Sequence, residues 1–347
     1  MDEKLHKCNT VTFGIIAYNE ERYLPKLLTN LLDQSYPKSS IEVILVDGNS
    51  NDTTRNIMTK FQTKYMEEYI AIKILDNYKR IQPAGWNMVI TNASCDVILR
   101  IDAHAEIPAD FIEKSMSCIN EGENVCGGLR INKMDRSTPW KNMLLDVEQT
   151  LLGSGFAQYR RKSKERTYTK SVFHGAYRRE VFERVGLFNE GLSRTEDNEM
   201  HYRIRKAGYR ICYDSNIISF YQTRNTLKKM LNQKLKNGFW IGKTLYVCPD
   251  CLSLFYFAPL ALVLASAGAV ILTLYGHKKI LLLEGALYAI VLLPSAIYRM
   301  IKNHNIADIV LPIVCGMVHF TYGIGIILGV FSGKPTNSHT YVSKDDR

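Results

Sequence analysis

An aliphatic stretch near residue 100 ends in a carboxylate and an imidazole two positions apart. The residues VILRI (97–101) are followed by Asp102, Ala103 and His104. An apolar run of this length is typical of a strand buried on both faces, so the polar side chains would lie where the strand ends. A carboxylate binds hard divalent cations, and an imidazole adds affinity for manganese or another transition metal. The pair indicates a metal site, although an exposed strand end without a ligand would show the same spacing.

Two earlier apolar runs also end in polar residues. The segment YNE (18–20) follows the first run, and DGNS (47–50) follows the second. Ligands of open α/β sheets bind beyond the carboxyl ends of the strands, so we expect these segments to lie near residues 102–104. The sequence has no G-x-G-x-x-G after the first run and no G-x-x-x-x-G-K-[ST], which argues against the common dinucleotide and P-loop sites. A diphosphate bound here would need a metal to offset its charge.

The elements that would position these residues alternate between strand and helix. Leucines at 24, 27, 28, 31 and 32 recur at the spacing of an amphipathic helix. Further strands are expected at 41–46, 71–75 and 96–102, and a further helix at 84–91. The pattern predicts a doubly wound α/β sheet.

The composition changes after about residue 250. Three long apolar runs follow, at 254–275, 280–298 and 309–331. A helix needs about 20 such residues to cross a bilayer. The first run has no charged residue, the second contains Glu284, and the third contains His319 and several glycines. We therefore expect about three transmembrane helices.

The expected layout is a soluble head on a membrane domain. It comprises a cytoplasmic catalytic domain (1–225), an amphipathic interfacial segment (226–250), a membrane domain (251–333) and a tail (334–347). The opening residues do not resemble a signal peptide, and lysine and arginine gather before the first run and between the second and third. This distribution predicts a multi-pass protein of the cell membrane with an odd number of crossings and an external C-terminus.

The net charge of +10 suggests an anionic partner. Many of the basic residues lie just before the first apolar run, where an anionic membrane surface would attract them. No RNA-binding signature or zinc-finger spacing accompanies them, so membrane lipid is the expected partner and nucleic acid is not.

Six short motifs, taken together and in this order, resemble those of the family 2 glycosyltransferases with the GT-A fold, most closely the succinoglycan-biosynthesis type of membrane glucosyltransferase. They are AYNEE (17–21), VDGNSNDTT (46–54), PAGWN (83–87), RIDAHAEIP (100–108), FHGAYRREVFERVGLF (173–188) and TEDNEMHYRIRKAGYRI (195–211). The likeness covers about residues 10–245. It implies an inverting, metal-dependent transfer of a sugar, glucose or a relative, from a UDP-sugar to a polyprenyl-diphosphate-linked saccharide in surface polysaccharide synthesis.

The resemblance also implies a set of residues that bind the nucleotide sugar. They are Ala17, Asn19, Glu20, Asp47, Asp52, Ala84, Gly85, Asn87, Arg100 and Asp102. Asp47 would accept a hydrogen bond from the uracil ring. Asp52 would line the same pocket, although an aspartate before Thr53 and Thr54 also fits the cap of a helix. Ala84, Gly85 and Asn87 would pack beside the ribose and phosphates.

For the metal, Asp102 matches the first acid of the family's Asp-x-Asp motif, and His104 stands where the second acid usually is. This departure agrees with the succinoglycan-type subgroup and with the Asp-x-His motif of the polypeptide N-acetylgalactosaminyltransferases. It implies Mn²⁺ or Mg²⁺ as the cofactor. His174 could be a third contact, or simply a loop residue.

Glu196 and Asp197 match the acidic pair on the acceptor side of the family's site. Asp197 would be the general base that deprotonates the acceptor hydroxyl. Acids at the start of a helix also need no catalytic role, because they stabilise its N-terminus.

The segment 226–246 places apolar residues against lysines, as in an interfacial helix. It lacks the Gln-x-x-Arg-Trp motif of processive synthases, because Gln233 is followed by Lys236. A processive polysaccharide synthase is therefore the alternative enzyme. A catalytically inactive membrane scaffold of the same fold is the alternative of another class.

Overall fold

The computed structural model describes residues 6–134, 137–150, 166–224, 226–277 and 279–335. The described chain divides into two units, one made of residues up to 131 and 166–221, the other of 132–150 and 222–335. The second unit therefore includes a segment from the middle of the chain, which differs from the single boundary near residue 225 expected from the sequence. Most of the expected tail, residues 336–347, lies outside the described residues.

The first unit is built on one mixed sheet. Its strands are β1 (Val11–Ala17), β2 (Ile41–Asp47), β3 (Ala71–Asp76), β4 (Val97–Asp102), β5 (Ala105–Glu106), β6 (Val125–Lys133), β7 (Thr167–Tyr168), β8 (Gly175–Arg178) and β9 (Ile211–Gln222). The order is β3-β2-β1-β4-β8-β6-β9-β5, with β7 on β9. β1 to β4 pair in parallel, whereas β8 pairs antiparallel with β4 and β6. The predicted α/β class is confirmed, but only half of the sheet has the parallel pairing typical of doubly wound folds.

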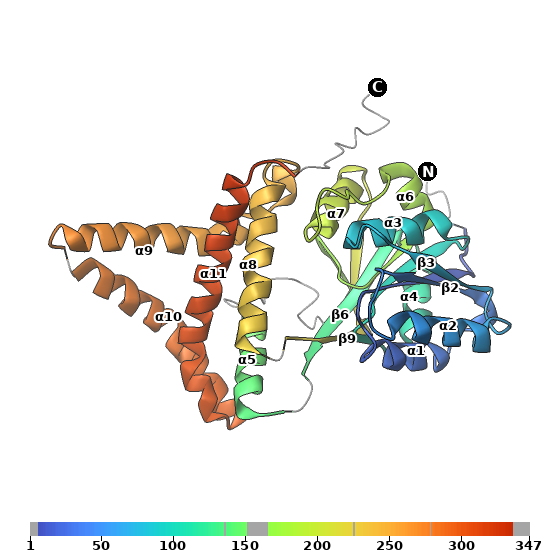
Figure 1. Cartoon of the computed structure of the whole chain (residues 1–347), viewed down its shortest axis with the longest axis horizontal. Helices are drawn as coiled ribbons and strands as arrows, with labels where there is room; N and C mark the ends of the chain where they lie inside the picture. The colour runs from blue at the N-terminus through green and yellow to red at the C-terminus, as the bar shows by residue number, and fades with distance from the viewer. Residues whose placement is uncertain (1–5, 135–136, 151–165, 225, 278, 336–347) are drawn as a thin grey trace. The chain divides into compact units, whose positions relative to one another are not determined.

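Helices cover both faces of this sheet (Figure 1). One face carries α1 (Leu24–Leu32), α2 (Thr54–Tyr65) and α4 (Phe111–Asn120), and the other carries α3 (Gln82–Asn92), α6 (Arg179–Val185) and α7 (Glu196–Lys206). Along β2, Val43 and Leu45 enter the first core, and Ile44 and Val46 enter the second. This strand is buried on both faces, as its aliphatic run predicts.

The register of the parallel strands brings three polar segments to one edge. Asp47 stands opposite Ala17 and Asp76, and Asp102 stands opposite Ile16. The residues that follow β1, β2 and β4 therefore leave the sheet together, because parallel strands end at the same side. This is the arrangement expected from the sequence.

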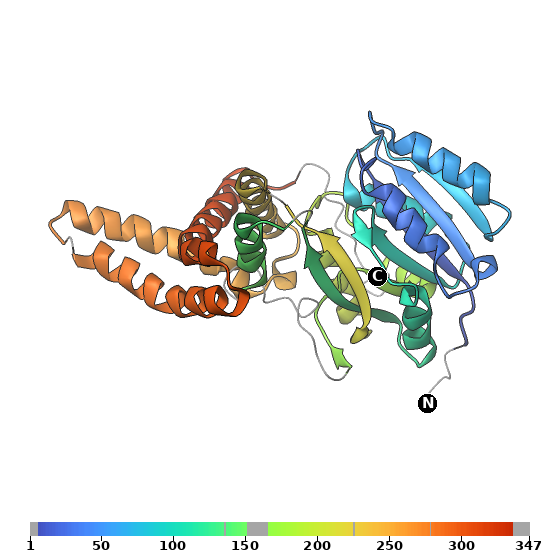
Figure 2. The ribbon, with the colours of Figure 1, turned by 90° about the horizontal axis from the view of Figure 1, so that it is seen from below.

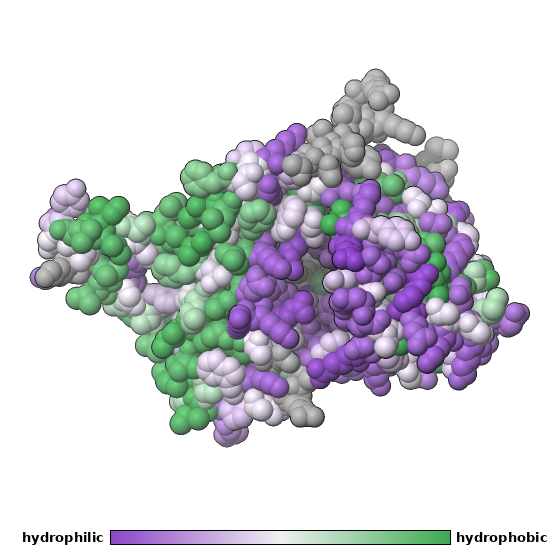
Figure 3. Space-filling model, viewed as in Figure 1, coloured by the Kyte–Doolittle hydropathy of each residue, from purple (hydrophilic) through white to green (hydrophobic). Residues whose placement is uncertain are grey.

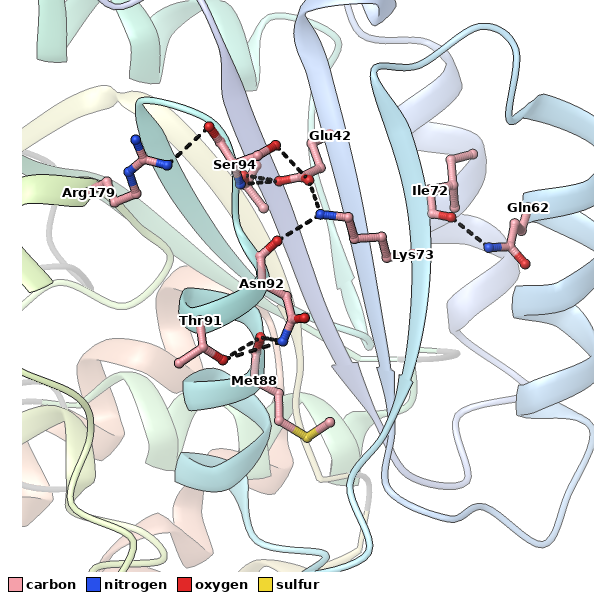
Figure 4. A network of polar contacts seen from close by, with 10 residues as sticks. Glu42, Gln62, Ile72, Lys73, Met88, Thr91, Asn92, Ser94 and Arg179 are labelled. Carbon is pink, nitrogen blue, oxygen red and sulfur yellow. Dashed lines mark hydrogen bonds and ion pairs between the residues drawn. The ribbon is translucent and has the colours of Figure 1, made fainter.

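A buried carboxylate at the other end of β2 joins three strands and the chain before β4 (Figure 4). Glu42, fully buried, accepts hydrogen bonds from Lys73 Nζ (2.6 Å), Thr12 Oγ1 (2.6 Å) and the Ser94 hydroxyl (2.9 Å). Burial by itself would raise the pKa of Glu42, but the bonds from Lys73, Thr12 and Ser94 outweigh it and lower the pKa. The network therefore stabilises the ionised form.

The second unit consists of helices. They are α5 (Pro139–Gln149), α8 (Leu227–Thr244), α9 (Ala258–Leu274), α10 (Lys279–Asn303) and α11 (Leu311–Phe331), with short 3₁₀ turns before α9 and α11. Three segments are long and apolar enough to cross a membrane, namely Leu254–Leu274, Lys279–Asn303 and Ile306–Phe331. They match the three predicted runs. The visible surface of α9, α10 and α11 is largely hydrophobic, whereas that of the first unit is largely hydrophilic (Figure 3).

We predict that Glu42→Ala destabilises the protein by about 3 kcal/mol, because it leaves buried donors without their acceptor. The midpoint of thermal unfolding of the detergent-solubilised protein measures this. Since the pKa of Glu42 is lowered by folding, its contribution is present above the unfolded pKa of about 4.3 and is lost as the pH falls below it. The matched variant Glu67→Ala, at an exposed position, should change the midpoint little. Equal midpoints for the two variants would contradict the stabilising role.

Candidate active site

The loops after β1 and β2 are tied together by side-chain hydrogen bonds. The backbone N–H of Asn19 donates to Ser50 Oγ (3.0 Å), and the backbone N–H of Asn51 donates to Asn19 Oδ1 (3.0 Å). The Ser50 hydroxyl donates to Asp47 Oδ1 (2.6 Å). Asn19 has a φ of 55°, a left-handed conformation that asparagine tolerates better than most residues. Asn19 and Asp47 therefore belong to one hydrogen-bonded cluster, in which the Asp47 carboxylate is held in a fixed orientation.

Asp52 holds the start of α2 against the loop after β1. Its Oδ1 accepts from the Thr54 N–H (2.9 Å), and its Oδ2 accepts from the Glu21 N–H (3.2 Å). Burial would raise the pKa of Asp52, but the hydrogen bonds from Thr54 and Glu21 bring it below its ordinary value. The side chain thus supports the start of α2 from the position before the N-cap residue, Thr53, rather than as the N-cap itself, and does so beside the cluster of Asn19 and Asp47.

The start of α3 packs closely on the end of β1. A Cβ added to Gly85 would lie 2.6 Å from Ile16 Cγ2, so no larger residue fits there without a shift. Ala84 is buried beside it. The side chain of Asn87 points elsewhere: its amide nitrogen donates to Phe188 O (3.0 Å), and its Oδ1 accepts from the Phe188 N–H (2.8 Å). Asn87 therefore anchors the segment after α6, and its expected contact with a nucleotide stays a prediction.

Asp102, at the end of β4, faces the imidazole of His174. The distance from Asp102 Oδ2 to His174 Nε2 is 3.8 Å, longer than a hydrogen bond, and His174 Nδ1 lies 2.9 Å from Ser219 Oγ. Burial would raise the pKa of Asp102, but His174, His104 and Arg100 hold it well below its usual range. Burial also lowers the pKa of His174, although Asp102 opposes this. The site therefore favours the ionised form of Asp102.

His104 lies between the loop after β1 and strand β9. Its Nδ1 is 3.0 Å from Glu20 Oε1, and its ring meets the Tyr221 ring edge-on at 4.9 Å. Burial alone would lower the pKa of His104, but the interaction with Glu20 and the charge of Asp102 raise it to about 9. Glu20, expected near the nucleotide, is thus the hydrogen-bond partner of His104.

The donor types around Asp102 suit a divalent cation. His104 Nε2 and His174 Nε2 are buried, and neither has a hydrogen-bond partner among the described residues. Across all the residues that the structure describes, no three His, Cys, Asp or Glu side chains lie close enough to one another to form a ligand set by themselves. A cation here would take its remaining ligands from a bound diphosphate and water, as Mg²⁺ commonly does in proteins.

Two adjacent acids begin α7 beside a buried arginine. Glu196 Oε1 is 3.3 Å from a terminal nitrogen of Arg100, whose guanidinium lies over the rings of Trp86 (4.7 Å) and Phe188 (5.2 Å). Burial raises the pKa of Glu196, and the charge of Asp197 adds to this, while Arg100 opposes it. Burial likewise raises the pKa of Asp197. Arg100, expected near the nucleotide, is in the structure the counter-charge of this acidic pair.

Several residues of the site were not identified from the sequence. Ser219 and Tyr221 on β9 contact His174 and His104, respectively. Arg130 lies over the rings of Phe173 (4.2 Å) and Tyr221 (4.6 Å). The two-residue spacing of Ser219 and Tyr221 places both on one face of the strand, a signal present in the sequence. The sequence does not indicate which residues they contact, because each partner lies more than 40 positions away.

His201 of α7 was also not identified from the sequence. His201 is buried, with Nδ1 2.9 Å from Ser171 Oγ and Nε2 2.8 Å from the Tyr177 hydroxyl. Burial lowers its pKa to about 3, so the ring is neutral near pH 7. It connects α7 to Ser171 and Tyr177 and does not belong to the cluster around Asp102.

Comparison with known proteins agrees with this architecture. The family model for glycosyl transferase family 2 matches residues 12–186. The chain is 27% identical over 334 residues to the dolichyl N-acetyl-alpha-D-glucosaminyl phosphate 3-beta-D-2,3-diacetamido-2,3-dideoxy-beta-D-glucuronosyltransferase of Methanococcus voltae, covering 94% of this chain and 99% of that one. It is 28% identical to the succinoglycan biosynthesis protein ExoA of Rhizobium meliloti, covering 65% and 66% of the two chains.

A solved structure shares the fold over most of the chain. It is a mannosyltransferase from Pyrobaculum calidifontis in complex with GDP-Man and Mn²⁺, with a TM-score of 0.58 at 16% identity, covering 94% of this chain and 88% of that one. The mixed α/β sheet is thus that of the GT-A glycosyltransferases. With the family model matching half of its length, the chain belongs to glycosyl transferase family 2 and is a glycosyltransferase.

Proposed function

We propose that this protein is a membrane-bound, inverting, metal-dependent glycosyltransferase that adds one sugar to a polyprenyl-linked saccharide in surface polysaccharide synthesis. The observation that carries the proposal is the group of carboxylates at the carboxyl edge of the sheet. Arg100 and Asp102 lie two residues apart on β4, and a terminal nitrogen of Arg100 is 3.3 Å from Glu196 Oε1. The carboxylates at the end of β4 and at the start of α7 are therefore connected through one arginine. Asp102 would take part in binding the anionic donor, and Asp197 would act on the acceptor hydroxyl.

The donor in this proposal is a UDP-sugar carrying glucose or a relative. The fixed orientation of Asp47 supports a hydrogen bond to a uracil N–H, because the residue is only 4% exposed and its carboxylate is held by Ser50. Asp102, His104 and His174 would hold Mn²⁺ or Mg²⁺ together with the diphosphate. The metal would supply positive charge that stabilises the departing nucleoside diphosphate.

The acid pair supports the proposed chemistry at the acceptor. Asp197 would take the proton of the acceptor hydroxyl while the hydroxyl oxygen forms a bond to the anomeric carbon. The bond to the nucleotide would break on the opposite face, which inverts the anomeric configuration. The raised pKa of Asp197 favours this role, because a base whose pKa lies closer to neutrality accepts a proton more readily.

The acceptor is inferred from the membrane helices and from the Methanococcus voltae relative. That relative is named for a dolichyl phosphate sugar, and it matches this chain over nearly its whole length, membrane helices included. We propose a polyprenyl phosphate or diphosphate carrying a sugar as the acceptor, in a cell membrane that the protein crosses more than once, with the catalytic unit in the cytoplasm. Addition of a single sugar is favoured because α8 lacks the Gln-x-x-Arg-Trp motif.

A donor and acceptor screen tests the function. We expect the purified protein in lipid to transfer a sugar from a UDP-sugar to a polyprenyl-linked acceptor only when Mn²⁺ or Mg²⁺ is present, and EDTA should abolish the reaction. Mass spectrometry of the product should show one added sugar. A ladder of products would indicate a processive synthase, and no turnover with any nucleotide-sugar donor would indicate an inactive scaffold.

Asp197→Asn should lower kcat for transfer by a factor of about 10² to 10⁴, because the acceptor hydroxyl loses its base. The affinity for UDP, measured by calorimetry, should change little. Asp33→Asn, at an exposed position, is the matched control and should keep full activity. Full activity in Asp197→Asn would exclude this residue as the base.

The variant Glu196→Gln tests whether the pKa of Asp197 sets the pH dependence of the transfer rate. It removes the repulsion between the two acids, so the pKa of Asp197 should fall. Since the base must be ionised, the acid limb of the rate profile should move to lower pH while activity at high pH persists. An unchanged acid limb would show that Asp197 does not control it.

His104→Asp should leave an active enzyme whose preference shifts from Mn²⁺ toward Mg²⁺, because an oxygen ligand replaces an imidazole. The ratio of initial rates with the two metals measures the shift. His6→Asp, at an exposed position, should leave this ratio unchanged. A folded but inactive His104→Asp variant would mean that the imidazole has a role other than binding metal.

A further inference from the structure

Helices α8 and α11 lie side by side in the same direction, with backbone against backbone. A Cβ added to Gly325 would lie 2.3 Å from Leu235 O, and one added to Gly329 would lie 2.0 Å from Phe239 O. Residue numbers rise together along both helices. Further toward their C-termini, the Tyr246 hydroxyl donates to Val330 O (2.7 Å). The contact thus continues to the end of both helices, and the two must lie at the same angle to a membrane.

The charge of α8 opposes a transmembrane position. The helix carries five lysines in 18 residues, at 228, 229, 234, 236 and 243, and it is not among the three segments apolar enough to cross. Lys236 lies at mid-helix and is exposed. A lysine at the centre of a transmembrane helix costs about 2.5 to 3.5 kcal/mol. Because α11 is bound along α8, α11 could cross only by carrying Lys236 to the middle of the bilayer.

Helix α9 runs crosswise to this pair. Its first turns meet the middle of α11, where a Cβ on Gly323 would lie 2.6 Å from Pro259 O and 2.7 Å from Val263 Cγ2. Beyond that point α9 is exposed, with Leu274 82% accessible at its end. In Figure 1, α9 extends away from α11 and α8, and α10 diverges from the far end of α9 toward the N-terminal end of α11; in Figure 2 α11 is seen nearly end-on. If α9 follows the membrane normal, α11 lies in the membrane plane.

The ends of α10 and α11 are joined to α5 and α8 by polar contacts. Asp146 of α5 binds Arg299 and Asn303 at the end of α10, and Glu148 pairs with Lys234 of α8 (2.8 Å). Such a cluster is far less costly at the membrane surface than at mid-bilayer. It therefore marks the level at which the hairpin of α9 and α10 leaves the surface.

The outer face of α11 is an apolar stripe. Six exposed residues recur at helical spacing, namely Ile313, Met317, Phe320, Ile324, Leu328 and Phe331. The exposed residues of α8 are instead polar, with Lys229, Asn232 and Lys236 at the same kind of spacing. One helix of the pair thus offers an apolar surface and the other a basic one, the combination found in helices that lie at an anionic membrane surface.

We propose that α8 and α11 form a layer in the plane of the membrane, with the α11 stripe inserted among the acyl chains of one leaflet. Within the described residues, the hairpin of α9 and α10 then provides the only crossings. The number of crossings is two rather than three, and the end of α11 returns to the side that holds the catalytic unit. This proposal does not depend on the identity of the donor or acceptor.

Epitope tags test the sidedness in the full-length chain. One tag is placed at the N-terminus, one at the C-terminus and one directly after His277, between α9 and α10. Antibody access is compared before and after the membrane is permeabilised. We expect both terminal tags on one side and the loop tag on the other. Terminal tags on opposite sides would establish three crossings and overturn the proposal, as would a loop tag on the same side as the termini.

A depth measurement separates the two orientations of α11 without a tag. The variants Ile313→Trp, Ile324→Trp and Phe331→Trp are reconstituted with lipids brominated at one acyl position, and quenching is compared with that of the parent protein. An in-plane helix should give similar quenching at all three positions. On α9, Leu264→Trp and Leu274→Trp are the matched pair, and their quenching should differ. A profile along α11 that varies as strongly as that along α9 would overturn the proposal.

Discussion

The concentration of negative charge beside a single buried arginine is the constraint on which the site depends. Arg100 is 3.3 Å from Glu196 and lies over the rings of Trp86 and Phe188. Burial and the charge of Asp197 raise the pKa of Glu196, and the charge of Asp102 adds to this. In a site with little water, three carboxylates can be ionised together only with added positive charge. The structure provides part of it through Arg100, and the two acids of α7 retain raised pKa values. A bound cation beside Asp102 would supply more, which links the metal site to the state of the acid pair.

The histidines of the first unit differ in their neighbours, and this separates candidate metal ligands from structural residues. The pKa of His104 is raised because Glu20 and Asp102 favour its charged form, whereas burial lowers the pKa of His174 and of His201. His201 has both ring nitrogens within hydrogen-bond distance of hydroxyl groups and is part of the scaffold. His104 and His174 each keep one ring nitrogen without a partner among the described residues. Unsatisfied buried nitrogens are costly, and this distinguishes ligand candidates from structural histidines.

In the second unit, two glycines of α11 determine how closely this helix packs on α8. Gly325 and Gly329 let α11 approach the backbone of α8, so an apolar helix and a basic helix behave as one body. The charges of α8 then decide where α11 can lie. Ion pairs, rather than glycine packing, hold α5 in this unit, since its acids pair with Lys234 and Arg299. Burying those acids requires partners of opposite charge, which α8 and α10 provide.

The sequence alone determined the local elements and the group of residues around Asp102. The leucine spacing predicted α1, the aliphatic runs predicted β2 and β4, and the polar strand ends were expected at one edge, because these features depend on short-range periodicity and on parallel pairing. Only the tertiary structure decided the antiparallel half of the sheet, the contacts of Ser219 and Tyr221 with the two histidines, and the salt bridge of Arg100 with Glu196, because these join distant parts of the chain. The orientation of α11 was likewise beyond the sequence: hydropathy measures a helix's length and composition, not the charge of the helix packed against it.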